Sequence, residues 1–152
     1  MLIMHKYGED HQMHFELANY TENGNLYVGL IVYDEEEKYY EPWQNLTVNL
    51  SVKCKDNRAF IDTNNNGNEI IAWLERNGLG HCTGNLMPSG WCVYPEFEFN
   101  MEALVPHVLK DYRENNNDWC YSIKISAKRI QKVNNQFGKG AQQKWRNTNG
   151  NR

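Results

Sequence analysis

Apolar and polar residues alternate strictly along residues 44–52 of the chain. The apolar positions in this segment are Leu46, Val48, Leu50 and Val52, and the polar positions between them are uncharged. A repeat of two is typical of a β-strand that turns one face toward a core and the other toward solvent. The pattern therefore predicts a strand that begins near Trp43 and ends at Val52, and we expect a helix to pack on its apolar face.

The same alternation predicts further strands before and after this segment. They cover residues 14–20, 26–33, 59–62, 91–99 and 119–126. Asn23-Gly24 separates the first two, and Asn-Gly is a strong signal for a tight hairpin turn. The strand 26–33 is apolar on both faces, so we expect it at the centre of an antiparallel meander. Pro95 indicates an edge position or a bulge in the strand 91–99.

Helical periodicity is clearest at residues 69–77. The apolar stripe of this helix consists of Ile70, Ile71, Trp73 and Leu74. Asn68 is placed to cap its start, and Gly78 is placed to end it in a left-handed conformation. A second helix is expected over residues 100–112, interrupted at Pro106.

The remaining segments predict connections. Residues 1–13 are mainly polar and predict a flexible start, while residues 63–68 and 81–90 contain the asparagine, glycine and proline residues that favour loops. Together the elements predict an α+β fold with one domain over residues 1–133, in which an antiparallel meander of about five or six strands packs against one or two short helices. Residues 134–152 predict a flexible basic tail.

Composition supports a single folded domain. The chain has 152 residues, of which 40% are hydrophobic and 23% are charged, as is usual for a folded soluble protein. No apolar run approaches the roughly 20 residues that cross a bilayer, and the start lacks the pattern of a secretory signal. We therefore expect a cytoplasmic protein without a membrane partner. Composition leaves the oligomeric state open.

The charges are divided unevenly along the chain. Residues 1–118 contain all 19 acidic residues and 8 of the 16 basic ones, which gives a net charge of −11. Residues 119–152 carry the other 8 basic residues and no acidic one, which gives +8. Such an asymmetry is typical of chains that bind polyanions or whose two parts bind each other.

Four adjacent acidic residues, Asp34 to Glu37, predict an exposed loop because they cannot be buried together. Aromatic residues follow them at once. Aromatic rings bury large areas at protein interfaces, and carboxylates set specificity there. The candidate residues for binding a protein partner are Glu35, Glu36, Glu37, Tyr39, Tyr40 and Trp43. The alternative is a loop that only raises solubility.

Reactive side chains form no recognised catalytic or metal-binding pattern. The cysteines are Cys54, Cys82, Cys92 and Cys120. They show no CxxC spacing, so we expect free thiols. His81 beside Cys82, and Glu96 with Glu98 on one strand face, are the nearest approach to catalytic pairs. No phosphate-binding glycine loop or nucleophile elbow is present. We therefore expect no catalytic residues, no metal and no cofactor, and a protein that is not an enzyme.

The order of several of these signals resembles that of a known family. The matching residues are Asn23-Gly24-Asn25-Leu26, Glu41-Pro42, Leu46-Thr47-Val48-Asn49-Leu50, Asn68-Glu69, Asn77-Gly78-Leu79, Thr83-Gly84, Pro88-Ser89-Gly90 and Trp91-Cys92-Val93. Over residues 14–99 the chain resembles a family of small uncharacterised bacterial proteins, a domain of unknown function, typically encoded on conjugative transposons and related mobile elements of gut Firmicutes. The resemblance implies no activity, catalytic residue or cofactor.

Two hypotheses of function follow. The first is a non-catalytic accessory protein of a mobile element that binds a protein partner through the acidic, aromatic surface and inhibits a host nucleic-acid-binding defence enzyme by covering its basic channel. The second is a nucleic-acid-binding protein that uses its basic C-terminal segment for phosphate contacts and base stacking. Its candidate residues are Lys128, Arg129, Lys132, Lys139, Lys144, Trp145 and Arg146. A third interpretation is that this segment docks on the acidic body.

Overall fold

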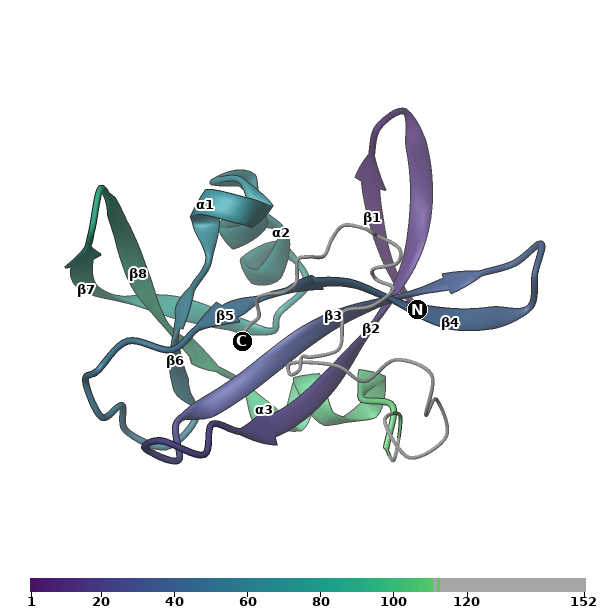
Figure 1. The fold of residues 1–152 in the computed structure, drawn as a ribbon. Coiled ribbons are helices and arrows are strands. Elements are labelled where there is room, and N and C mark those ends of the chain that lie inside the picture. The colour runs from purple at the N-terminus through teal and green to yellow at the C-terminus, as the bar shows by residue number, and fades with distance from the viewer. Residues whose placement is uncertain (111, 113–152) are drawn as a thin grey trace. The chain divides into compact units, whose positions relative to one another are not determined.

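The computed structural model describes residues 1–110 and residue 112, which contain two antiparallel sheets of four strands each (Figure 1). The first sheet consists, in spatial order, of β1 (Leu2–Lys6), β2 (Glu9–Asn19), β3 (Leu26–Asp34) and β4 (Tyr39–Asn45). The second sheet consists of β5 (Thr47–Val48), β6 (Arg58–Ile61), β8 (Cys92–Phe99) and β7 (Gly80–Ser89). The helical segments are α1 (Thr63–Asn66), α2 (Glu69–Arg76), α3 (Met101–Leu104) and the 3₁₀ turn η1 (Val105–His107).

The predicted α+β class is confirmed, but the described residues form eight strands in two sheets rather than one meander of five or six. All the elements above belong to the compact unit Met1–Leu109. The predicted strand at 119–126, the domain end at residue 133 and the basic tail 134–152 lie outside the described residues. None of the described helices is long and apolar enough to span a membrane.

The first residues form a hairpin, so the prediction of a flexible start at residues 1–13 is wrong. β1 pairs with the beginning of β2, which places Leu2 opposite Met13. Leu2, Met4 and Met13 are all buried. The turn between the strands uses positive φ angles at Tyr7 and Gly8. The alternation was missed because β1 contributes only two buried side chains.

β3 lies between β2 and β4, as its apolar character predicts. Its register places Leu30 opposite Phe15 of β2, and both side chains are buried in the core. Ile31 points to the other face of the sheet and is also only 2% exposed. Burial on both faces explains why β3 is almost continuously apolar.

The strand predicted over residues 44–52 is largely absent, because the chain changes sheets within it. At Leu46 the N–H donates to the Val28 carbonyl of the first sheet at 2.9 Å. The Leu46 carbonyl accepts from the Asp62 N–H, next to the second sheet, also at 2.9 Å. Strands that switch sheets form the corners of packed sheets. The alternation does not follow burial throughout, because Thr47 is 2% exposed and Val52 40%, and the predicted strand remains only as the end of β4 and as β5.

After β5 the chain forms a loop that the β2–β3 turn holds in place. Asn25 is 4% exposed. Its amide nitrogen donates to the Val52 carbonyl at 2.8 Å, and its amide oxygen accepts from the Cys54 N–H at 2.9 Å. The Asn23 amide nitrogen donates to the Leu50 carbonyl at 3.3 Å. Side-chain amides thus satisfy the backbone groups that a strand partner would otherwise satisfy.

α2 is the helix that the sequence predicts at residues 69–77. Gly78 has a φ of 72°, and its N–H donates to the Glu75 carbonyl at 3.0 Å. The Leu79 N–H donates to the Leu74 carbonyl at 3.0 Å. These two bonds form a Schellman motif. The motif turns the chain so that Leu79 is buried in the core together with Leu74.

The predicted loop at residues 63–68 contains the single-turn helix α1. Asp62 caps it by accepting from the Asn65 N–H at 3.1 Å. Burial raises the pKa of Asp62, and the hydrogen bonds from Asn65 oppose this shift. The side chain of Asn68 makes no capping hydrogen bond to α2, so the predicted cap is wrong.

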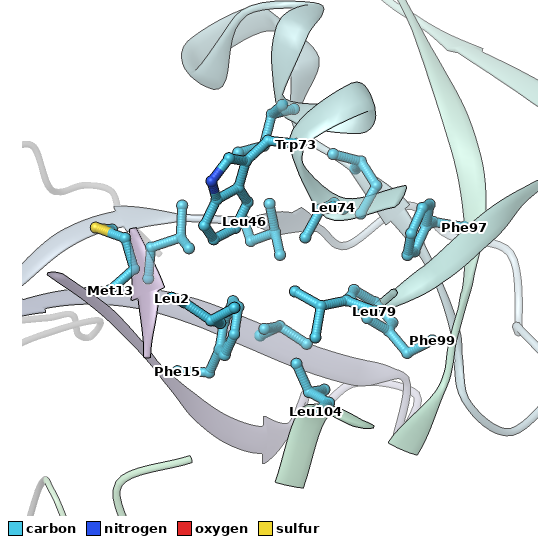
Figure 2. Close-up of a cluster of buried hydrophobic side chains, with 14 of the residues drawn as sticks. Leu2, Met13, Phe15, Leu46, Trp73, Leu74, Leu79, Phe97, Phe99 and Leu104 are labelled. Atoms are coloured by element: carbon cyan, nitrogen blue, oxygen red, sulfur yellow. The ribbon is translucent and has the colours of Figure 1, made fainter. Parts of the chain in front are cut away.

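A single core joins both sheets to α2 (Figure 2). Leu46 lies below Trp73 of α2 in this view, and Phe97 and Phe99 approach from β8. The Trp73 indole N–H donates to the Ile3 carbonyl at 2.8 Å and so ties α2 to β1. The expected packing of the apolar helix against a sheet is therefore confirmed. A smaller cluster on the opposite face of the second sheet consists of Leu50, Cys54 and Phe60.

The predicted loop at residues 81–90 is mostly strand β7, which pairs with β8. The pairing is irregular between Cys82 and Leu86, and Leu86 lies opposite Pro95. The extra residues belong to β7, and β8 is an inner strand, so Pro95 lies beside an irregularity but its own strand is neither bulged nor at the edge. Gly80 has a φ of 146°, and a Cβ there would collide with the Glu98 backbone. Glycine and proline in this stretch permit close approach and irregular pairing rather than a loop.

The second predicted helix is shorter than residues 100–112. Asn100 caps α3 by accepting from the Ala103 N–H at 3.3 Å. The helix tightens into η1 at Val105 and ends at His107, one residue after Pro106. The chain then extends beside β2, where the Leu109 N–H donates to the Phe15 carbonyl at 2.8 Å.

Replacement of Asn25 tests whether its side-chain hydrogen bonds hold the loop that follows β5. Asn25→Ala leaves the Val52 carbonyl and the Cys54 N–H without their partners, so we expect the free energy of unfolding to fall by about 2–3 kcal/mol in urea denaturation. Asn19→Ala is the control, because that exposed amide makes a single bond, to the Gly24 carbonyl. An equal loss of unfolding free energy in the two variants would contradict a special role of Asn25 in holding the loop.

Candidate functional site

The acidic turn between β3 and β4 has a defined backbone. The Asp34 carboxylate accepts from the N–H groups of Glu36 and Glu37 at 2.9 and 3.0 Å. The Lys38 N–H donates to the Asp34 carbonyl at 2.8 Å, and Lys38 has a φ of 63°. An aspartate that bonds the backbone after it fixes such turns. The hairpin therefore holds its acidic residues in a set position at its end (Figure 1).

The carboxylates of this turn face solvent. Glu35, Glu36 and Glu37 are all exposed. Within residues 1–110, the basic side chains that form ion pairs do so elsewhere, and none is paired with these three carboxylates. The turn is thus a concentrated negative charge that is free to attract an external cation.

Tyr39 lies next to the turn and binds a carboxylate. Its hydroxyl donates to Glu41 Oε2 at 2.8 Å. This bond, with smaller effects of burial and of the charges on Glu41, Asp34 and Glu37, raises the pKa of Tyr39 to about 12. Since the ring is 46% exposed, Tyr39 presents a neutral aromatic surface beside the acidic turn.

Tyr40 points to the opposite face of the hairpin from Tyr39, because neighbouring residues of a strand alternate. Its ring packs edge-on against His14 with centroids 5.1 Å apart, and against Tyr33 at 4.8 Å. Burial, followed by the charges of His107 and the N-terminus, lowers the pKa of His14. This face is therefore an uncharged aromatic cluster at neutral pH.

Trp43 lies at the base of the hairpin. The β3–β4 register shifts there: Pro42 lies opposite Ile31 and Gln44 opposite Leu30, so Trp43 is the extra residue of a bulge. Bulges redirect a side chain, and the indole lies against the rings of His11 at 4.8 Å and Tyr7 at 6.3 Å, as well as against the core.

The six candidate residues thus occupy three places on one hairpin. Glu35, Glu36 and Glu37 form the turn with Tyr39 beside them, while Tyr40 and Trp43 lie nearer the body on separate surfaces. The turn and Tyr39 can contact a partner together. The candidate nucleic-acid-binding residues, from Lys128 to Arg146, lie outside the described residues.

The carboxylates of β8 form a structural network. Glu96 and Glu98 share one strand face, as expected, and both pair with Arg58 of β6, at 3.8 and 3.1 Å. Glu96 Oε1 also accepts from Thr83 Oγ1 at 2.7 Å and from Asn85 Nδ2 at 2.8 Å. These bonds satisfy the buried carboxylate and join three strands of the second sheet.

Among the described residues, the cysteines and histidines do not form a metal-binding cluster. Within residues 1–110 and 112, no three histidine, cysteine or acidic side chains are grouped so that they could hold a metal ion. Burial, together with the charge of Glu75, raises the pKa of the Cys82 thiol. Cys82 is therefore less nucleophilic at neutral pH than an ordinary cysteine.

One exposed group was missed in the sequence. Leu86, Trp91 and Val93 lie near the end of the β7–β8 hairpin and are 64%, 104% and 54% exposed. A signal was present, because residues 82–95 form a run of 14 residues without a charged side chain. The signal was not used, because residues 81–90 were predicted to form a loop, in which a strand face with exposed apolar side chains is not expected.

The pKa of Tyr39 tests the geometry of the acidic hairpin. Glu41→Ala removes the main cause of the shift, so we expect the Tyr39 pKa to fall from about 12 toward the ordinary value of 10.0, measured by NMR titration of ring-labelled tyrosine. Glu36→Ala is the matched control, because Glu36 does not contribute to the shift. A Tyr39 pKa unchanged in Glu41→Ala would show that the bond is absent in solution.

Comparison with protein families gives one match. The family model described as "Domain of unknown function (DUF4313)" covers residues 14–122, and thus extends past the residues 14–99 over which the resemblance was expected. Comparison with curated proteins and with solved structures gives no match. Because the family model covers well over half of the 152 residues, the chain belongs to the DUF4313 family of domains of unknown function.

Proposed function

We propose that this protein is a non-catalytic binding protein that attaches to a basic surface of a protein partner through its β3–β4 hairpin. The observation that carries the proposal is the exposed turn of Glu35, Glu36 and Glu37, whose carboxylates have no ion-pair partner in residues 1–110. Charges that are not neutralised within their own molecule steer association and select partners of opposite sign.

The form of the hairpin favours binding. The bonds from Asp34 fix the turn before a partner arrives, so less conformational entropy is lost on association. Tyr39 adds an exposed ring beside the carboxylates, and tyrosine is enriched in protein interfaces. The surrounding body does not oppose a basic partner, because residues 1–110 contain 16 acidic and 7 basic residues.

The finer proposal concerns the kind of partner. The family resemblance supports a role for the protein as a cytoplasmic accessory factor of a mobile genetic element. An acidic hairpin on such a factor is suited to the basic channel in which a host defence enzyme holds nucleic acid. The carboxylates would compete with phosphates for the same lysine and arginine side chains, and the protein would thus inhibit that enzyme.

Charge reversal with a charge-matched control tests the proposal. We expect Glu35→Lys/Glu36→Lys/Glu37→Lys to lose a protein that the wild type retains from host lysate, measured by quantitative mass spectrometry. The control Glu9→Lys/Glu22→Lys/Glu102→Lys changes the net charge equally at other exposed sites and should keep that protein. Retention of no protein by the wild type, or equal retention by both variants, would contradict the proposal.

The uneven charge of the chain supports a second candidate function, binding of nucleic acid by the basic segment. Residues 119–152 carry a net +8, which suits contacts with phosphates. We expect Kd for duplex DNA, measured by fluorescence anisotropy on the full chain, to weaken steeply with salt. Replacement of Lys128, Arg129 and Lys132 by glutamine should flatten that salt dependence. Negligible binding at low salt would exclude this function.

A further inference from the structure

The end of the β7–β8 hairpin exposes a group of apolar side chains. Leu86 is 64% exposed, Val93 54% and Trp91 104%, and Pro88 beside them is also exposed. These four residues are named the apolar end here. Single exposed apolar residues are common on protein surfaces, but a contiguous group of them marks an interaction site.

The strand register gathers these side chains on one face. Pro88 lies opposite Val93, and Leu86 opposite Pro95, so Leu86, Pro88 and Val93 point to the same side of the hairpin. Trp91 lies beside them in the turn that joins the two strands. Nearer the body, Phe97 continues this side of β8 into the core. The apolar end is thus an outward continuation of the core surface.

The hairpin is anchored from its other face. Met87 and Tyr94 lie opposite each other in the register and pack against the small cluster on the outer face of the second sheet. Gly90 and Trp91 form a two-residue turn, and Gly90 supplies the positive φ, 61°, that such turns require. Trp91 is therefore displayed on a well-supported turn.

The absence of charge points to the occupant of this surface. Residues 82–95 contain no charged side chain, in a chain whose residues are 23% charged. In a contact with two-fold symmetry, residues near the axis meet their own copies, so any charge there would face a like charge. An uncharged, apolar surface suits such a self-contact, because its partner surface is apolar as well.

Other occupants fit less well. A bilayer with anionic lipids would repel a body with 16 acidic and 7 basic residues in its first 110 positions. Addition of a strand to the edge of β7 is opposed by Pro88, which has no N–H, and by the irregular pairing before Leu86. Packing of face against face avoids both difficulties.

We propose that two copies of this protein associate through the apolar end, with Trp91 of each copy packed on the hairpin of the other. A tryptophan buries about 150–250 Å², whereas a stable interface buries about 800 Å² on each partner. Four side chains of each copy provide less than this, so we expect a weak dimer that forms only at high protein concentration.

The placement of the two hairpins leaves the acidic turns of both copies accessible in this dimer. Within residues 1–109 the β3–β4 hairpin and the β7–β8 hairpin project from opposite ends (Figure 1). A dimer joined at the second hairpin leaves both acidic turns free and able to bind at once. That double binding rests on the proposed function, whereas the dimer itself does not.

Sedimentation equilibrium of the full chain, from about 2 to about 200 μM, tests the dimer. We expect a monomer–dimer equilibrium in the wild type and at least about a tenfold weaker association in Trp91→Ser/Leu86→Ser. The control Val52→Ser/Val105→Ser removes two apolar side chains that are 40% and 42% exposed at other sites, and it should associate like the wild type. Circular dichroism establishes that each variant is folded.

Three results would overturn the proposal. They are a wild type that stays monomeric over the whole range, association that survives in Trp91→Ser/Leu86→Ser, and a monomer that sediments with phosphatidylcholine vesicles through Trp91. The charge-reversed variant Glu35→Lys/Glu36→Lys/Glu37→Lys should dimerise normally. Its loss of a protein partner would therefore be separable from any failure of the dimer.

Discussion

The passage of the chain from one sheet to the other at Leu46 is the constraint on which the rest of the structure depends. This residue donates a backbone hydrogen bond to β3 and accepts one from Asp62, and its side chain is fully buried between the sheets. The two sheets are therefore held together by covalent continuity and by hydrogen bonds, as well as by apolar packing. α2 closes the core over this corner (Figure 2).

Sequence reasoning succeeded where one pattern had one structural explanation. The helix ending at Gly78 was predictable because an apolar stripe and a left-handed terminator both indicate it. Alternation over residues 44–52 was ambiguous, because a period of two does not show which backbone groups are paired. Thr47 is buried and Val52 is exposed in this segment, against the pattern. The amides of Asn23 and Asn25 reach this segment from a distant turn, and no local pattern reveals such contacts.

The candidate site also combines features that could be predicted from the sequence with features that could not. Exposure of Glu35, Glu36 and Glu37 follows from the cost of burying adjacent charges, and it could be predicted from sequence. The separation of Tyr39 from Tyr40 could not be predicted, because the expected strand began only near Trp43, whereas β4 begins at Tyr39 and its alternation divides the two residues. Trp43 owes its position to a bulge, which depends on the register with β3. A register is a property of two strands and is absent from either sequence alone.

The order of the strands also bears on how the protein folds. In the first sheet each strand pairs with the next one along the chain, and short turns join the four strands. This sheet can therefore form by local pairing, which closes only small loops at low entropic cost. The second sheet instead pairs Arg58 with Glu98 across 40 residues. We expect the first sheet to provide an early template and the pairing of β6 with β8 to limit the folding rate. Until that step, the apolar face of β8, which carries Phe97 and Phe99, stays open to other chains.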